Sequence, residues 1–140
     1  MNSPPIRKRG VVAVIVRDAK LLVIRRSEFV RAPGMYCFPG GGIEEGESEE
    51  IALRREMQEE LNSIVEPLRP LWRYVTSWGV DLSWWLAHLP PEIEPVLNPA
   101  EVAELTWLTP TEIKALPRLL ESNLQFLEAI ERGEILISGL

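Results

Sequence analysis

The longest apolar run in the chain, VVAVIV at residues 11–16, is typical of a buried β-strand because it is short and rich in β-branched side chains. A turn at residues 18–20 separates it from LLVI, so residues 10–26 are predicted to form a hairpin or two neighbouring strands. Such a run is far too short to cross a bilayer, and we therefore expect no membrane association.

Size and composition favour one compact unit. A chain of 140 residues that is 46% hydrophobic and 26% charged is predicted to form a single domain over residues 1–140, with residues 1–8 as a flexible N-terminal tail. The opening MNSPPIRKRG lacks the apolar stretch of a secretory signal, and Cys37, as the one cysteine, makes no internal disulfide. We expect a cytoplasmic protein.

Charge narrows the class of partner. A formal net charge of −6 argues against a broad nucleic-acid-binding surface, which would need clustered Lys and Arg. Eight of the 21 acidic residues fall within residues 44–60, where they repel one another unless something positive binds. The expected partner is a small molecule, and two-fold homo-oligomers are common enough to make a homodimer a reasonable guess.

The rest of the chain alternates between strand and helix signals. Residues 31–46 contain PGGG and are predicted to be a loop, with strand only at 36–38. Ser48 is the expected N-cap of a helix that runs to about Leu61 and stops at Asn62, with Leu53 and Met57 on its buried stripe. Further strands are predicted at 64–75, 82–89 and 104–108, and helices at 111–116 and 118–132, closed by glycine 133. The predicted fold class is α/β, with strands and helices sharing one layered core.

An acidic face on the first helix carries the chemistry. Glu56, Glu59 and Glu60 are at positions i, i+3 and i+4, which places their carboxylates within a sector of roughly 100°. Mg²⁺ relieves the repulsion in such a cluster, since it pairs a few carboxylates with phosphate oxygens and water.

The glycine triplet just before the helix suits a phosphate. Backbone N–H groups of Gly40, Gly41 and Gly42 are predicted to approach a phosphate or to shape the metal site. Taken separately, most acidic helix faces are merely solvated and most glycine-rich loops are merely tight turns. The spacing between the acidic face and the glycine triplet distinguishes this chain from one that has an ordinary solvated helix and an ordinary turn.

Residues 41–63, GGIEEGESEEIALRREMQEELNS, resemble the Nudix box, whose pattern is G, five residues, E, seven residues, R-E-apolar-x-E-E-x-G-apolar. Seven of the nine specified positions match. Asn62 replaces the glycine and Ser63 the last apolar residue, which affects the exit from the helix more than the glutamates. FPGG at 38–41 and EVAELTW at 101–107 resemble flanking features of the family. The resemblance implies an α/β/α sandwich around a mixed sheet.

The resemblance also implies an activity: attack of water on one phosphorus of a diphosphate, with Mg²⁺, or Mn²⁺ as a substitute, bridging phosphate oxygens. Under it we assign Glu56 and Glu60 as primary metal ligands, Glu59 as a ligand or base, and Glu47 as a weaker ligand or a supporting residue. Arg55 is expected to clamp Glu56 rather than contact substrate.

The general base is the most open role. The family places it on a box glutamate or on a later loop, where Glu101 and Glu104 are available. We prefer Glu101, while its alternative is an ordinary surface acid.

Other residues have both a functional and a structural interpretation. Arg26 is a candidate phosphate contact or part of a solvated basic rim. Trp78, Trp84 and Trp85 are candidate stacking surfaces for a base, with packing in the core as the alternative. Trp84 and Trp85 must point to opposite sides of a strand, so at most one of these two faces the cleft, and Trp85 is preferred. Cys37 is more readily explained as a small buried side chain than as a nucleophile.

The substrate is left open. A nucleoside triphosphate, oxidised forms such as 8-oxo-dGTP included, is the first hypothesis. Residues 26–41 resemble, with one residue missing, the upstream signature of coenzyme A diphosphatases, so coenzyme A, nucleotide sugars and ADP-ribose are alternatives. A nucleotide sensor without turnover would be favoured by loss of a box glutamate, and an isomerase on the same scaffold by a catalytic cysteine.

Overall fold

The computed structural model describes residues 8–140, in which eight strands and three helices alternate as the sequence indicates. In chain order they are β1 Lys8–Val14, β2 Val16–Arg17, β3 Lys20–Arg26, β4 Tyr36–Cys37, β5 Gly40–Gly42, α1 Glu49–Leu61, β6 Glu66–Val75, β7 Val80–His88, β8 Val102–Leu108, α2 Pro110–Lys114 and α3 Glu121–Glu131. The predicted tail lies outside the described residues except for Lys8, which is the first residue of β1.

The strands form two sheets. The first sheet has the order β5-β1-β7-β6 and is mixed, because β1 and β7 are parallel while the outer pairs are antiparallel. In the second sheet, β3 pairs with β2, β4 and β8, all antiparallel. The predicted hairpin is β2–β3, whose turn residues Asp18 and Ala19 have φ of 52° and 61°. The apolar run at 11–16 is divided at Ile15, where the chain passes from the first sheet to the second.

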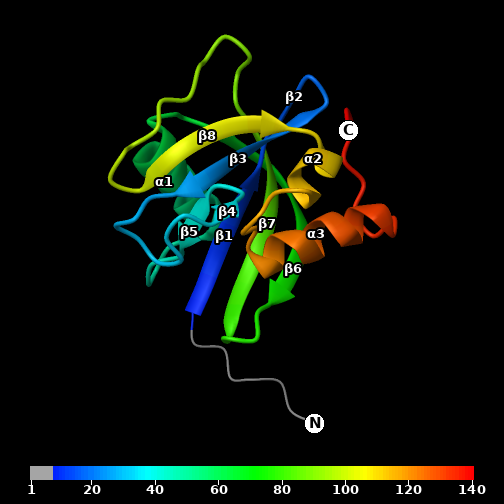
Figure 1. Cartoon of the computed structure of the whole chain (residues 1–140). Coiled ribbons are helices and arrows are strands. Elements are labelled where there is room, and N and C mark those ends of the chain that lie inside the picture. The colour runs from blue at the N-terminus through cyan, green and yellow to red at the C-terminus, as the bar shows by residue number, and fades with distance from the viewer. Residues whose placement is uncertain (1–7) are drawn as a thin grey trace.

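Helices cover both sides of the strands, with α1 on one side and α2 and α3 on the other (Figure 1). Side chains alternate between the two sides, so Val11 packs toward Leu53 of α1 while Val12 packs toward Phe126 of α3. The sandwich architecture and mixed sheet confirm the predicted fold class. The single core that we expected is instead two apolar clusters, one on each side of the strands.

The first helix begins and ends where the sequence predicts. Ser48 Oγ accepts the N–H of Ile51 at 3.2 Å, which satisfies one of the free donors of the first turn. Asn62 stops the helix in the left-handed region with φ of 50°. The predicted stripe of Leu53, Met57 and Leu61 is fully buried, and Glu56 and Glu60 are buried on the face beside it.

The glycine triplet is a strand, which corrects the predicted turn. β5 pairs with β1 so that Gly42, Gly41 and Gly40 lie opposite Gly10, Val11 and Val12. These three glycines do not have positive φ angles. Two of them are required for close approach, because a Cβ at Gly40 would overlap the carbonyl of Val11 and one at Gly41 would overlap the Glu56 carboxylate.

The last helix begins three residues later than predicted. Arg118 has φ of 62°, and Leu119 forms an isolated bridge with Tyr36, so α3 starts only at Glu121. At its other end, Gly133 has φ of 79° and closes the helix as expected. No helix within residues 8–140 is long and apolar enough to span a membrane.

Candidate metal and active site

The acidic face of α1 lies against β5. Glu56 and Glu60 are buried, with 8% and 5% of their surface exposed, whereas the side chain of Glu59 is 45% exposed. Glu60 Oε1 accepts the N–H of Gly40 at 2.8 Å. Two of the three glutamates predicted to share a face are therefore buried, and Glu59 lies at the solvent edge.

One predicted phosphate donor is already engaged, and a second glycine of the triplet is bound through its carbonyl. The N–H of Gly40 is bound to Glu60, and the carbonyl of Gly42 accepts from Arg55 at 2.8 Å. Gly41 leaves the space that the Glu56 carboxylate occupies. The glycines were predicted either to approach a phosphate or to shape the metal site. The contacts in this structure support the second role, because the triplet shapes the site of the carboxylates.

Arg55 organises the carboxylates around it. Its Nε and Nη2 bind both oxygens of Glu47 at 2.7 and 2.8 Å, and its Nη1 contacts Glu56 at 3.0 Å and Glu59 at 3.3 Å. The expected clamp on Glu56 is present, but the bidentate partner is Glu47.

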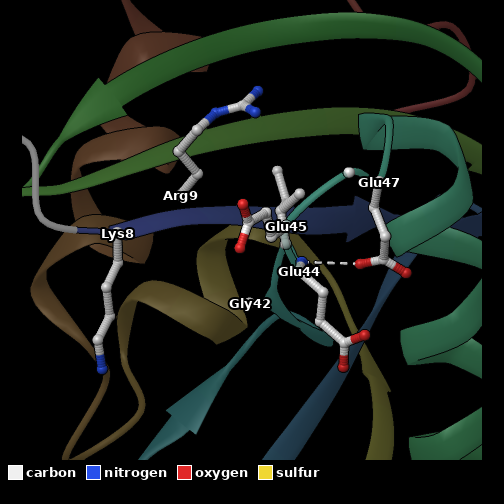
Figure 2. Close-up of a pocket in the computed structure, with 8 residues that line it drawn as sticks. Lys8, Arg9, Gly42, Glu44, Glu45 and Glu47 are labelled. Atoms are coloured by element: carbon white, nitrogen blue, oxygen red, sulfur yellow. Dashed lines mark hydrogen bonds between the residues drawn. The ribbon is translucent and has the colours of Figure 1, made fainter.

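Glu47 is held from two directions. The Arg55 guanidinium, with the N–H of Glu44 at 2.8 Å, lowers the pKa of Glu47 to about 2. Figure 2 shows the Glu47 carboxylate turned back toward Glu44, in a shallow pocket that Lys8 and Arg9 also line. Since Arg55 already occupies both its oxygens, Glu47 acts here as a support for Arg55.

Burial gives the remaining pair its chemistry. Burial raises the pKa of Glu60 well above its usual range, and the charge of Glu56 raises it further, against the opposing effects of Gly40 and Arg26. The pKa of Glu56 is also raised, mainly by burial, although Arg55 opposes this. A divalent cation bound between these two carboxylates would offset the cost of their buried negative charges, and carboxylate oxygens are ligands suited to such a cation.

The residues fit a hard cation that completes its shell with other ligands. Within the described chain, no three His, Cys, Asp or Glu side chains form a ready-made cage. Mg²⁺ typically takes one or two carboxylates and fills its other positions with water and phosphate oxygens. Glu56 and Glu60 would hold it, with Glu59 at the rim.

Glu101 is brought to this pair from the loop between β7 and β8. It is half-buried, and its charge contributes to the raised pKa of both Glu56 and Glu60. Glu104 instead contacts Arg25 at 3.2 Å and the Tyr36 hydroxyl at 3.4 Å. Of the two later acids, only Glu101 is placed to act on a group bound at Glu56 and Glu60.

A pocket of about 710 Å³ adjoins the carboxylates through Arg26. Arg26 lines it and also lies 3.9 Å from Cys37 Sγ, near enough to Glu60 to lower the pKa of that carboxyl. The lining also includes the cationic side chains of Lys8 and Arg31, the aromatic side chains of Tyr74 and Trp78, and one acid, Glu121, among apolar and hydroxyl residues. Trp78 is 83% exposed at the β6–β7 turn.

The two adjacent tryptophans point to opposite sides of β7, as predicted. Trp84 is fully buried on the α3 side, while the Trp85 indole N–H donates to Glu49 at 2.8 Å on the α1 side. Trp85 does not line the pocket, so the structure gives no support to its predicted stacking role, and Trp78 lies there instead. Its place beside Gly79, a residue typical of a turn, is a sequence signal that could have favoured Trp78.

Cys37 is a buried core residue. Burial is the main reason that the pKa of its thiol is raised to about 11, so the thiolate needed of a nucleophile is scarce at neutral pH. This agrees with its expected role as a small buried side chain and removes the basis for an isomerase.

Glu49 is a residue of the site region that sequence reasoning missed. Its carboxylate accepts from Ser83 Oγ at 2.6 Å and from Trp85, and it pairs with Arg9 at 3.1 Å and Arg73 at 3.3 Å. These bonds tie the start of α1 to three strands of the first sheet. A glutamate in a first helical turn suggests only a dipole effect, which explains why its partners were not foreseen.

An α/β/α sandwich with buried paired carboxylates beside a cationic pocket defines a metal-dependent phosphohydrolase. The family model of the NUDIX domain matches residues 7–130, and the chain belongs to the Nudix hydrolase family. Like its relatives it is a diphosphohydrolase that acts on nucleoside diphosphate derivatives, and enzymes of this family generally use divalent metal cations.

The relatives cover nearly the whole chain. The CTP pyrophosphohydrolase of Escherichia coli (strain K12) is 33% identical over 123 residues, which are 85% of this chain and 87% of that protein. The solution structure of the E. coli ORF135 protein is similar with a TM-score of 0.72, 26% identity and 91% of each chain covered. A MutT NUDIX hydrolase from Burkholderia pseudomallei has a TM-score of 0.67 and 26% identity, over 86% of this chain and 95% of that one.

Gly41→Ala tests the contact between β5 and Glu56. The added methyl group displaces the Glu56 carboxylate, so we expect a loss of about 1 to 3 kcal/mol in the free energy of unfolding and at least tenfold weaker Mg²⁺ binding. Urea unfolding and calorimetric titration measure both. Gly42→Ala is the matched control, because a Cβ there meets no atom within 4 Å. Equal effects of the two substitutions would contradict the assignment.

Glu60→Gln tests the cost of the buried charge. Because the pKa of Glu60 is raised in the folded state, the folded protein binds more protons than the unfolded chain between about pH 4.3 and that raised pKa, and its stability falls as pH rises through this window. Glutamine keeps an acceptor for Gly40 without the charge. In EDTA we expect the variant to melt above the wild type at about pH 7.5 and to converge with it near pH 4.

Calorimetric scans with and without Mg²⁺ complete this test. Added Mg²⁺ should raise the melting temperature of the wild type and leave that of Glu60→Gln almost unchanged, since the variant lacks a ligand. A variant less stable than the wild type at every pH would show that the charge is already neutralised in the metal-free protein.

Proposed function

We propose that this chain is a Mg²⁺-dependent nucleoside triphosphate pyrophosphohydrolase that releases pyrophosphate and a nucleoside monophosphate. The observation that carries the proposal is that Arg26 lines a pocket large enough for a nucleoside and also lies near enough to the buried Glu60 to lower the pKa of that carboxyl. The similarity to the E. coli CTP pyrophosphohydrolase supports a triphosphate.

Each residue of the site has a definite task in this proposal. Glu56 and Glu60 hold Mg²⁺, which when bound supplies charge neutralisation for the phosphates and a water of lowered pKa. Arg55 keeps Glu56 and Glu59 in place by hydrogen bonds at 3.0 and 3.3 Å. Glu101 accepts the proton of the attacking water as general base.

Substrate recognition falls to the pocket. Arg26 contacts the phosphate chain, since it stands between the pocket and Glu60. Lys8 and Arg31 offer further positive charge, and Trp78 and Tyr74 offer aromatic faces for a base. Stacking tolerates many bases, so oxidised nucleotides such as 8-oxo-dGTP remain candidate substrates beside CTP.

A substrate panel tests the proposal. Purified protein with Mg²⁺ is incubated with the common nucleoside triphosphates, 8-oxo-dGTP, ADP-ribose, nucleotide sugars and coenzyme A, and products are separated by ion-exchange chromatography. We expect monophosphate and pyrophosphate from a triphosphate, with turnover at least 100-fold lower in Glu56→Gln. Cleavage of ADP-ribose or coenzyme A alone would replace the triphosphate, and Mg²⁺-dependent binding without any product would favour a sensor.

Trp78→Ala tests the pocket separately from the chemistry. Removing the indole should raise KM for the preferred triphosphate by roughly 5- to 100-fold with little change in kcat, because stacking contributes about 1 to 3 kcal/mol per base. Trp78→Phe should retain most of the affinity. Steady-state kinetics of both variants decide, and an unchanged KM in Trp78→Ala would place the base elsewhere.

A further inference from the structure

The loop between β7 and β8 is attached to the end of the helix that carries the glutamates. The N–H of Val96 donates to the carbonyl of Leu61 and that of Asn98 to the carbonyl of Glu60, both at 2.9 Å. Asn98 Nδ2 donates to the carbonyl of Glu59 at 3.0 Å. The last carbonyls of a helix have no partner within it, so these bonds both complete α1 and fix the loop to its final turn.

From Asn98 the bonding continues into the segment that bears Glu101. Asn98 Oδ1 accepts the N–H of Ala100 at 3.2 Å, and its carbonyl accepts the N–H of Glu101 at 2.9 Å. On the other side, Ser27 Oγ donates to the carbonyl of Ala100 at 2.9 Å, and the N–H of Ser27 donates to the carbonyl of Glu101 at 3.0 Å. All four backbone polar groups of residues 100–101 are thus held by two residues.

The side chain of Glu101 has no such restraint. Among residues 8–140 its carboxylate takes part in no hydrogen bond or ion pair, whereas Glu47, Glu56 and Glu59 all contact Arg55. The backbone is therefore the part of Glu101 whose position these hydrogen bonds hold. Ser27 is 3% exposed at the end of β3, so the second sheet supplies one side of the restraint and α1 the other.

We propose that Asn98 and Ser27 are positioning residues that hold Glu101 at the Glu56 and Glu60 pair. The inference rests on the proposed role of Glu101 as general base. Asn98 sets the distance of Glu101 from the metal-binding turn of α1, and Ser27 prevents the loop from turning away. Misplacing a reacting group by about 1 Å can cost roughly 100-fold in rate, so a backbone clamp of this kind affects turnover without touching substrate.

The variants separate this role from general stability. Asn98→Ala removes the side-chain bonds to Glu59 and Ala100, and Ser27→Ala removes the hydroxyl bond to Ala100. Asn62→Gly is the matched control. It removes a side-chain hydrogen bond of 2.8 Å to the carbonyl of Val96, which lies in the same loop but farther from Glu101 along the chain than Asn98 does. Glycine can keep the left-handed backbone of residue 62.

We expect kcat to fall at least tenfold in Asn98→Ala and severalfold in Ser27→Ala, with KM unchanged and kcat of Asn62→Gly near that of the wild type. A double-mutant cycle with Glu101→Gln then decides whether Asn98 acts through Glu101. If it does, Asn98→Ala has little further effect once Glu101→Gln is present. Independent, additive losses would overturn the proposal, and so would an Asn98→Ala variant no slower than Asn62→Gly.

The same cycle on Mn²⁺ affinity needs no substrate. Glu101→Gln removes a negative charge near the metal ligands, so the dissociation constant measured by electron paramagnetic resonance should rise roughly fivefold. Asn98→Ala should weaken Mn²⁺ binding when it is introduced into the wild type. It should have no further effect on Mn²⁺ binding when it is introduced into the Glu101→Gln variant. If no triphosphate is cleaved, the proposed substrate fails while this experiment still tests the positioning role. Equal weakening in both backgrounds would refute it.

Discussion

The structure depends on keeping two like-charged carboxylates together away from water. Burying either Glu56 or Glu60 as an anion is costly, and each makes the other more so. The compensation available from the protein is small: one backbone N–H for Glu60 and one contact from Arg55 for Glu56. The protein thus retains an unfavourable arrangement that a cation reverses, as expected of a binding site rather than of a core.

That arrangement determines much of the surrounding architecture. Helix α1 lies so close to β5 that a side chain at Gly41 would overlap the Glu56 carboxylate, so glycine occupies a position where strand propensity alone would disfavour it. Ser48 and Asn62 fix the length of the helix, and Glu49 ties its start to the first sheet. Arg55 then gathers the outer acids that would otherwise repel the pair.

The sequence was informative where local rules apply. The bounds of α1, the opposite orientation of Trp84 and Trp85 and the buried state of Cys37 follow from capping, strand geometry and composition. Each can be decided from a few neighbouring residues. The same is true of the spacing that placed Glu56 and Glu60 on one face.

Features that depend on distant pairing were missed or misassigned. The glycine triplet has the composition of a turn, but its partner β1 lies about 30 residues earlier and makes it a strand. The preference for Trp85 over Trp78 finds no support in the lining of the pocket, because which side of a sheet faces a pocket is set by helices packed later in the chain. Likewise, nothing local indicates that Asn98 meets Glu59, some 39 positions away.

The outer strand of the first sheet has a separate consequence for how copies of this protein can meet. β6 pairs with β7 on one side and is the edge of its sheet, and its register shifts twice, between Pro67 and Arg69 and between Pro70 and Trp72. Proline offers no N–H to an incoming strand, and bulges twist an edge away from flat pairing. Although Leu68 is exposed there, this edge is a poor template for aggregation by strand addition, and assembly has to use another surface.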